Sequence, residues 1–222
     1  MNKIVNFDSY DEFVLYRKSK TIRELGAGSE GSCYLGSDGL AYKDLTNGFS
    51  KRDYILENVI TSSECDNKSF AFPHVLFAVN DELVGYTTNV VKKDITNEKY
   101  LSTYGIDHID FDKLYSAYQV LYQDSIKLAE KGISIIDLSF NLMFDGEKFT
   151  AVDTCEYFYT SGECIKHNTE SVDDAVKNLF TIYALFNFDE ELDTSLDVKE
   201  FLQMVKTKYS SSDTNGKPYL KK

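Results

Sequence analysis

Residues Leu25–Lys43 read LGAGSEGSCYLGSDGLAYK, and this stretch decides the fold that we predict for the chain. Its first three glycines, Gly26, Gly28 and Gly31, have Gly-x-Gly-x-x-Gly spacing. Glycine costs backbone entropy, so this density is expected where φ must be positive or where a phosphate approaches backbone N–H groups. In a dinucleotide-binding fold the third glycine opens a helix. Here short apolar runs flank the turn Ser37–Gly39, which predicts strand, turn and strand.

The second of these strands carries Ala41, Tyr42 and Lys43. Side chains alternate across a strand, so we expect Ala41 and Lys43 on one face and Tyr42 on the other. A glycine-rich hairpin followed by a small residue and a lysine covers the phosphates of ATP in protein kinases. Taken alone, the stretch fits a plain β-turn beside a surface lysine equally well.

The composition limits the class of protein. The chain has 222 residues, of which 42% are hydrophobic, and this fits one globular unit or two small lobes. A formal net charge of -12 argues against binding to nucleic acid or anionic lipid. No apolar run approaches the roughly 18 residues of a membrane span, and the N-terminus lacks a signal-peptide core, so we expect a soluble, cytoplasmic protein. The four cysteines lack metal-ligand spacing and are expected to be buried free thiols.

Hydrophobic periodicity predicts strands, a helical segment and one longer helix in the N-terminal part, and mainly helices in the C-terminal part. In chain order we expect a helical segment around residues 10–16, strands at 21–25, 32–35 and 40–45, a helix from 51 to about 63, strands at 74–79 and 83–91, and helices at 110–132, 172–188 and 196–209.

Polar residues follow the short apolar runs of the second half. The run Ile133–Ile136 ends at Asp137, and Asn141 follows shortly after it. A predicted hairpin over residues 142–152 ends at Asp153. Carboxylate and amide oxygens are hard ligands that Mg²⁺ accepts together with phosphate oxygens. These three residues therefore predict a metal and phosphate site.

The order of these motifs is that of a known family. Protein kinases carry His-Arg-Asp-Leu-x-x-x-Asn, a hairpin and Asp-Phe-Gly in this region. This chain has IIDLSFN at residues 135–141, a predicted hairpin, and DTC at residues 153–155. Together with the glycine turn and Lys43, this order resembles the protein kinase-like superfamily, and especially its small, divergent bacterial Ser/Thr kinases, from about Thr21 to about Phe188.

The resemblance implies an α+β, bilobal fold. Residues 1–91 would form an N-lobe with a helical extension, a five-stranded sheet and one helix. Residues 92–209 would form a minimal, mainly helical C-lobe, and residues 210–222 a flexible tail.

The resemblance also implies a role for each matching residue, with ATP and Mg²⁺ as cofactors. Lys43 would bind the phosphates and pair with Glu57, with Glu64 as the competing candidate, and Asp137 would orient or deprotonate the acceptor hydroxyl. Asn141 and Asp153 would hold the metal. The other nucleotide contacts would come from Gly26, Gly28, Gly31, Cys33, Ala41, Thr88, Asn89 and Val91.

Several residues depart from the family pattern. Ile135 and Ile136 replace the His-Arg pair, so no arginine there can read a phosphorylated activation loop. Three residues separate Asp137 from Asn141 where the family usually has four. Either this loop has lost a residue or Asn141 is not a metal ligand.

Three functions stay open at this point. The first is transfer of phosphate from ATP to a Ser/Thr hydroxyl of a protein, and the second is a pseudokinase that binds nucleotide or protein partners without turnover. The third is a small-molecule kinase of the aminoglycoside or choline type. The chain is short for a helical insertion that forms a small-molecule pocket, which favours a protein acceptor. The acceptor, the oligomeric state and any regulator stay open.

Overall fold

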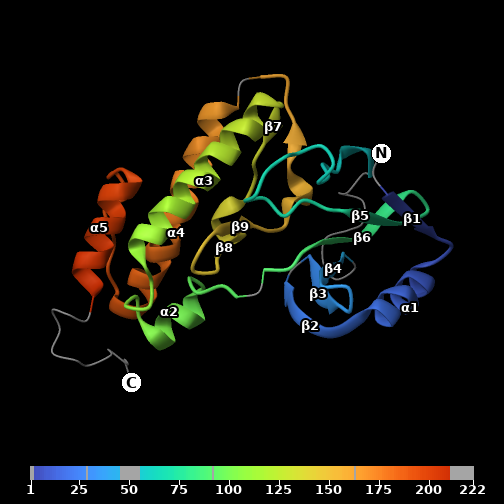
Figure 1. The fold of residues 1–222 in the computed structure, drawn as a ribbon, viewed down its shortest axis with the longest axis horizontal. Helices are drawn as coiled ribbons and strands as arrows, with labels where there is room; N and C mark the ends of the chain where they lie inside the picture. Colours follow the sequence, from blue (N-terminus) through green and yellow to red (C-terminus); the bar gives the residue numbers. More distant parts are fainter. Residues whose placement is uncertain (1–2, 29, 46–55, 92, 163, 211–222) are drawn as a thin grey trace. The chain divides into compact units, whose positions relative to one another are not determined.

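The structure is a computed structural model that describes residues 3–28, 30–45, 56–91, 93–162 and 164–210. It is a mixed α+β structure, and the described residues form five α-helices and a six-stranded mixed sheet (Figure 1). The chain divides into two compact units. The first contains residues 1–67, 71–90 and 153–159, and the second contains residues 68–70, 91–152 and 160–222.

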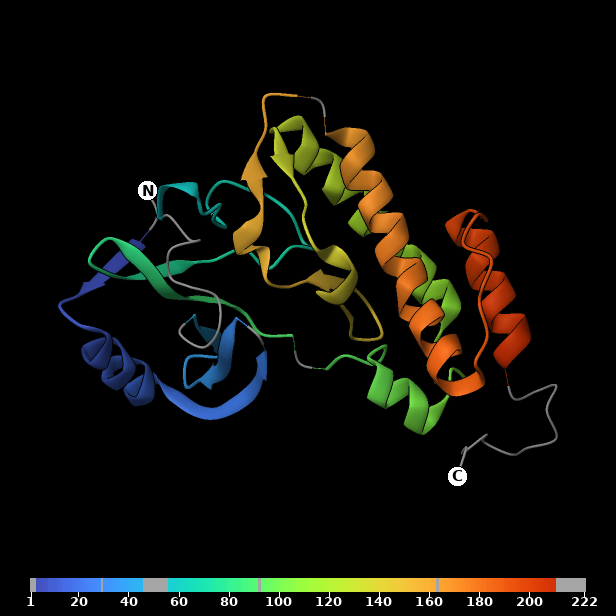
Figure 2. The same ribbon diagram turned by 180° about the vertical axis from the view of Figure 1, so that it is seen from behind.

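A mixed sheet is the centre of the first unit (Figure 2). Its strand order is β1-β5-β6-β4-β3-β2, with β1 parallel to β5 and every other neighbouring pair antiparallel. Five of these strands were predicted, and β1 was not. The bounds are β1 Lys3–Phe7, β2 Thr21–Gly28, β3 Gly31–Gly36, β4 Leu40–Asp44, β5 Val75–Val79 and β6 Glu82–Asn89.

Helix α1, Tyr10–Lys20, confirms the predicted helical spacing near the N-terminus. Ser9 caps it by accepting a hydrogen bond from the backbone N–H of Glu12. Phe13 of this helix is fully buried and packs in a cluster with Phe77 and Tyr42. Tyr42 therefore lies on the face of β4 that packs in this aromatic cluster, and side-chain alternation turns Lys43 to the opposite face.

The helix predicted from residue 51 to about 63 was wrong over residues 56–63, and residues 51–55 lie outside the described residues. A single 3-10 turn, Leu56–Asn58, is present instead. The Glu64 carboxylate accepts hydrogen bonds from the N–H and hydroxyl of Thr61, at 2.7 and 2.9 Å. The N–H of Ser62 donates to the carbonyl of Pro73. The backbone N–H groups of Thr61 and Ser62 thus donate to a nearby side chain and to a distant carbonyl, and are not available for the hydrogen bonds of a helix.

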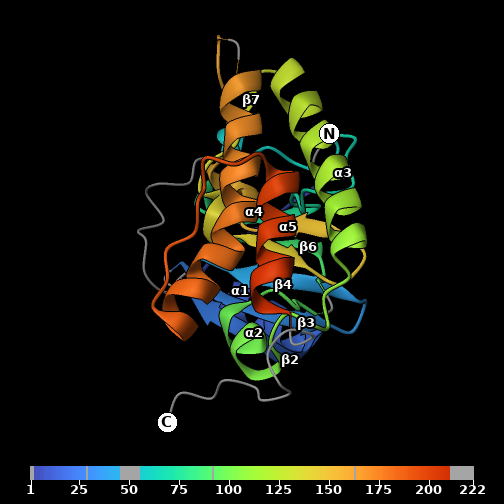
Figure 3. The ribbon, with the colours of Figure 1, turned by 90° about the vertical axis from the view of Figure 1, so that its left-hand side faces the viewer.

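The second unit is mainly helical, and its helices α3, α4 and α5 lie side by side (Figures 1 and 3). Asp110 caps α3 through the N–H groups of Asp112 and Lys113, and the helix begins within one residue of the predicted start. Helix α4 begins earlier than predicted, and α2 was not predicted. The bounds are α2 Glu98–Tyr104, α3 Phe111–Glu130, α4 Ile165–Phe188 and α5 Val198–Tyr209, with short strands β7 Ile133–Ser134, β8 Leu142–Phe144 and β9 Phe149–Ala151.

The predicted hairpin between Asn141 and Asp153 is present as the antiparallel pair β8 and β9. The remaining elements are 3-10 turns at Leu138–Phe140 and Thr154–Glu156 and the strand β10, Phe158–Tyr159. Within the described part of the chain, no helix has both the length and the apolar character needed to span a membrane.

Candidate functional site

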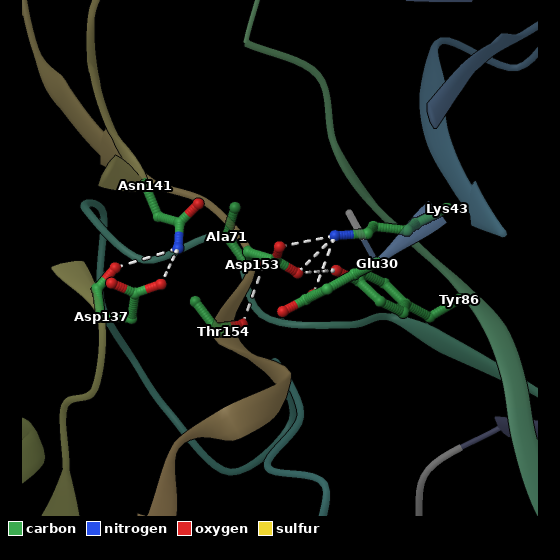
Figure 4. A network of polar contacts seen from close by, with 8 residues as sticks. All are labelled: Glu30, Lys43, Ala71, Tyr86, Asp137, Asn141, Asp153 and Thr154. Carbon is green, nitrogen blue, oxygen red and sulfur yellow. Dashed lines mark hydrogen bonds and ion pairs between the residues drawn. The ribbon is translucent and has the colours of Figure 1, made fainter. Parts of the chain in front are cut away.

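An ion-pair cluster surrounds Lys43 in the first unit (Figure 4). The Nζ of Lys43 lies 2.6 Å from each carboxylate oxygen of Asp153 and 3.4 Å from Oε2 of Glu30. The Tyr86 hydroxyl donates to Oδ1 of Asp153 at 3.3 Å. The pairing of Lys43 with Asp153 joins residues that are 110 positions apart in the chain. The fold therefore brings together two of the residues that the sequence singled out.

Backbone geometry places each member of this cluster. Lys43 lies on β4 in register with Cys33 of β3, and with Tyr86 of β6 on its other side. Asp153 follows β9 with φ +60°, a left-handed conformation that is uncommon outside glycine. A 3-10 turn begins directly after it. Strained positions of this kind persist where the surrounding structure holds them, and they concentrate at functional sites.

The cluster fixes the protonation states of its members. Burial alone would lower the pKa of Lys43, but the carboxylates of Asp153 and Glu30 outweigh it and raise the pKa. Burial raises the pKa of the Tyr86 hydroxyl and of the Cys33 and Cys155 thiols. At neutral pH the cation is therefore Lys43, while the hydroxyl and both thiols are uncharged. The predicted burial of the cysteines holds for Cys65, Cys155 and Cys164, whereas Cys33 is half-buried.

The three glycines of the predicted phosphate turn have different surroundings. A Cβ atom added at Gly26 or Gly28 would meet nothing within 4 Å. A Cβ atom at Gly31 would lie 1.7 Å from the carbonyl oxygen of Asp44, and Gly31 has φ +152°. Folding of the hairpin therefore requires glycine at Gly31. It does not require glycine at Gly26 or Gly28, where a ligand that approaches the backbone would be a reason for it.

Four more of the predicted nucleotide contacts lie on β4 and β6 or follow β6. Ala41 is buried and stands in register with Thr88. The Thr88 hydroxyl donates to the carbonyl of Ala71 at 2.8 Å. The side-chain oxygen of Asn89 lies 3.1 Å from Nε2 of His74. Val91 belongs to the second unit.

The predicted pairing of Lys43 with Glu57 is replaced by other contacts. Glu57 is exposed on the short 3-10 turn. Glu64, the competing candidate, accepts hydrogen bonds from Thr61 and from the hydroxyl of Tyr159. Among the described residues, the carboxylates bonded to Lys43 belong to Glu30 and Asp153.

Asp137 and Asn141 are the first and last residues of a loop, residues 137–141, in the second unit. Asp137 is exposed and has φ +49°, again left-handed, and the 3-10 turn Leu138–Phe140 follows it. The amide of Asn141 donates to the Asp137 carbonyl at 2.9 Å and lies 3.5 Å from its carboxylate. Despite the short spacing, the loop holds the two side chains next to each other, as Figure 4 shows.

Helix α4 positions this loop through residues that the sequence analysis did not identify. Asn168 is fully buried, accepts from the N–H of Ile135 at 3.0 Å and donates to the carbonyl of Ile133 at 2.9 Å. Nε2 of His167 lies 2.9 Å from the carbonyl of Ile135. Asn178 donates to the carbonyl of Ser139. In the sequence, an asparagine on the apolar stripe of a helix could have indicated this role, because a buried amide needs hydrogen-bond partners.

The donor set fits a Mg²⁺–nucleotide complex in part. The Asp153 carboxylate offers hard oxygens that suit Mg²⁺, and the Lys43 ammonium suits phosphate oxygens. Within the described ranges, no group of three or more His, Cys, Asp or Glu side chains is arranged to hold a metal ion. A magnesium ion would therefore need phosphate oxygens as further ligands, which is how it is usually bound in kinases.

Comparison with known proteins adds no family assignment. The chain matches none of the models of known protein families and none of the curated proteins with which it was compared.

Proposed function

We propose that the chain is an ATP- and Mg²⁺-dependent phosphotransferase with a bilobal, protein kinase-like fold. It transfers the γ-phosphate of ATP to a hydroxyl group of a protein. The observation that carries this proposal is the contact of Lys43 with Asp153 beside a glycine-rich hairpin. Phosphoryl transfer needs little covalent chemistry from the protein and depends on positioning and electrostatic stabilisation of phosphate.

Each residue has a defined task in this proposal. Lys43 binds the phosphates, which the backbone of the hairpin covers, and Asp153 holds Mg²⁺. When bound, Mg²⁺ neutralises negative charge on the phosphates. Asp137 orients the acceptor hydroxyl and accepts its proton, and its exposure leaves the carboxylate accessible to a protein acceptor. The amide of Asn141 supports Asp137 through the 2.9 Å bond to its backbone.

Nucleotide binding can be measured by thermal unfolding. Mg²⁺–ATP at a hundredfold excess over Kd should raise the Tm of the wild type by about 5–10 °C, because binding to the folded state stabilises it. Asp153→Asn should remove the metal-dependent part of this rise. Asp81→Asn is the matched control, because Asp81 is exposed in the same unit and also has a left-handed φ, +61°. A wild type whose Tm does not respond to Mg²⁺–ATP would refute nucleotide binding.

Catalysis needs a separate assay. Labelled γ-phosphate should appear on the protein itself or on added acceptor proteins. Asp137→Asn should slow the labelling by about 10²–10⁴-fold, the usual contribution of a general base. Glu147→Gln removes an exposed carboxylate of the same unit and should have no effect. Equal labelling by the wild type and Asp137→Asn would show that Asp137 is not the base.

One observation favours a second candidate, a pseudokinase that binds nucleotide without turnover. In a protein kinase, phosphate transfer requires the strand lysine to pair with a helix glutamate. Here Lys43 is bonded to Asp153 and Glu30 instead. Mg²⁺–ATP binding without any transfer of label would support this candidate.

A further inference from the structure

The glycine-rich hairpin contributes a side chain, as well as backbone, to the Lys43 cluster. Glu30 lies between Gly28 and Gly31 in the sequence, and its Oε2 is 3.4 Å from Nζ of Lys43. Asp153 binds the same ammonium from 2.6 Å. Lys43 is therefore held by two carboxylates that come from distant parts of the chain, and Figure 4 shows both contacts.

This arrangement is largely shielded from water. Each of the three side chains has only 16–17% of its surface exposed. Charges in such a setting interact more strongly than at an open surface, and salt screens them less. Among the described residues of this cluster, the formal charges of the two carboxylates and the one ammonium sum to -1. Tyr86, Cys33 and Cys155 do not change this sum, because burial raises their pKa values and keeps them neutral.

A net negative site poses a problem for a phosphate ligand. A phosphate that binds Lys43 must replace the contact of the ammonium with Glu30, and it meets the charge of Asp153 as well. A divalent cation reverses this situation, because it binds carboxylate and phosphate oxygens together and neutralises part of the phosphate charge.

We propose that Glu30 is a specificity-determining residue of this site, which admits phosphate compounds complexed with a divalent cation and rejects the bare anions. This inference rests on the proposed nucleotide-binding function. The Glu30 carboxylate and a phosphate group compete for the ammonium of Lys43, and a divalent cation reduces this competition.

The test is a set of calorimetric titrations of the full chain with ATP, in excess Mg²⁺ and in excess EDTA. Glu30→Gln keeps the size of the side chain and removes its charge. It should bind ATP in EDTA at least about tenfold more tightly than the wild type, since one charge repulsion is lost. Binding of Mg²⁺–ATP should change by less than about threefold, because the cation already offsets that repulsion. Glu24→Gln, an exposed position on the same hairpin, should behave as the wild type.

The outcomes separate this inference from the function on which it rests. Equal affinity of the wild type and Glu30→Gln for ATP in EDTA, with normal binding of Mg²⁺–ATP, would overturn the role of Glu30 and leave the nucleotide site standing. If Glu30→Gln gained the same affinity for ATP in Mg²⁺ as in EDTA, the proposed discrimination between complexed and bare phosphates would also be overturned, because Glu30 would then oppose both forms equally. Absence of binding in every medium and variant would overturn the proposed function and this inference together.

Discussion

Replacing Gly31 with alanine should disrupt the glycine-rich hairpin, whereas alanine at Gly28 should be tolerated. A Cβ atom at Gly31 would lie 1.7 Å from the carbonyl oxygen of Asp44, and ordinary contact begins near 3.4 Å. The obstacle is backbone of the neighbouring strand β4, so no side chain can turn aside to make room. Strand β3 would have to move away from β4 by more than an ångström.

The magnitude follows from two contributions. A residue other than glycine at the φ of Gly31 costs about 1–3 kcal/mol in backbone strain. Each inter-strand hydrogen bond that breaks costs about 0.5–1.5 kcal/mol more. We therefore expect Gly31→Ala to lower the free energy of unfolding of the hairpin by about 3–5 kcal/mol. A Cβ at Gly28 meets no atom within 4 Å, so its alanine variant should stay within about 1 kcal/mol of the wild type.

Hydrogen–deuterium exchange of peptides from β2, β3 and β4 is the suitable assay, because it reports the opening of individual segments rather than the unfolding of the whole chain. Gly31→Ala should speed exchange in these peptides by about a hundredfold or more, and Gly28→Ala should not. Gly28→Ala should instead weaken Mg²⁺–ATP binding by about tenfold, because a Cβ keeps phosphate away from the backbone. Normal protection in Gly31→Ala, or equal loss in both variants, would refute the reasoning.

Three further predictions concern buried or partly buried polar groups. Asn168→Ala leaves three buried backbone groups without their amide partner and should lower the free energy of unfolding in urea by about 2–4 kcal/mol. Asn178→Ala removes one such bond and should lower it by less than about 1.5 kcal/mol. Similar losses in the two variants would contradict the role given to Asn168. Burial would raise the pKa of Asp124, but hydrogen bonds from Lys127, Lys68 and Ser69 outweigh burial and lower the pKa. The ionised Asp124 carboxylate therefore stabilises the folded state above pH 3.8, and this stabilisation is lost as the pH falls through the pKa of the folded state. The stability gap between the wild type and Asp124→Asn should therefore narrow in acid urea titrations, and a constant gap would contradict the assignment. A double-mutant cycle of Lys43→Met and Asp153→Asn should give a coupling energy of about 1–3 kcal/mol, and additive effects would exclude a direct contact.

Most strands and long helices were predictable because a local pattern specified them. The turn Ser37–Gly39 separated β3 from β4, and hydrophobic periodicity located α3. Strand β1 was missed because it pairs in parallel with β5, a partner far along the chain, and no turn announces it. The helix predicted from residue 51 was wrong over residues 56–63 because Thr61, Ser62 and Glu64 bond locally or to Pro73, and periodicity does not report such competition.

The candidate site was predictable in its residues more than in its contacts. Lys43 was singled out because its strand follows the glycine turn, and Asp153 because it follows a predicted hairpin, and the structure places them in direct contact. Glu30 was not predicted although it lies inside the glycine turn, because the Gly-x-Gly-x-x-Gly spacing specifies no residue type at the positions between the glycines. The partner of Lys43 was expected on a helix, and tertiary packing supplies it from the turn instead. Asn168 acts through backbone groups of β7 and of Ile135, which follows it, and no sequence spacing reveals these partners.

The central claim is that Lys43 lies where the phosphates of ATP bind, and affinity labelling tests it most directly. An acyl-phosphate derivative of ATP transfers its acyl group to an amine next to the phosphates, and peptide mass spectrometry identifies the labelled lysine. The account predicts labelling concentrated on Lys43 in the presence of Mg²⁺ and prevented by excess ATP. Labelling spread over exposed lysines, with no protection of Lys43 by ATP, would contradict it.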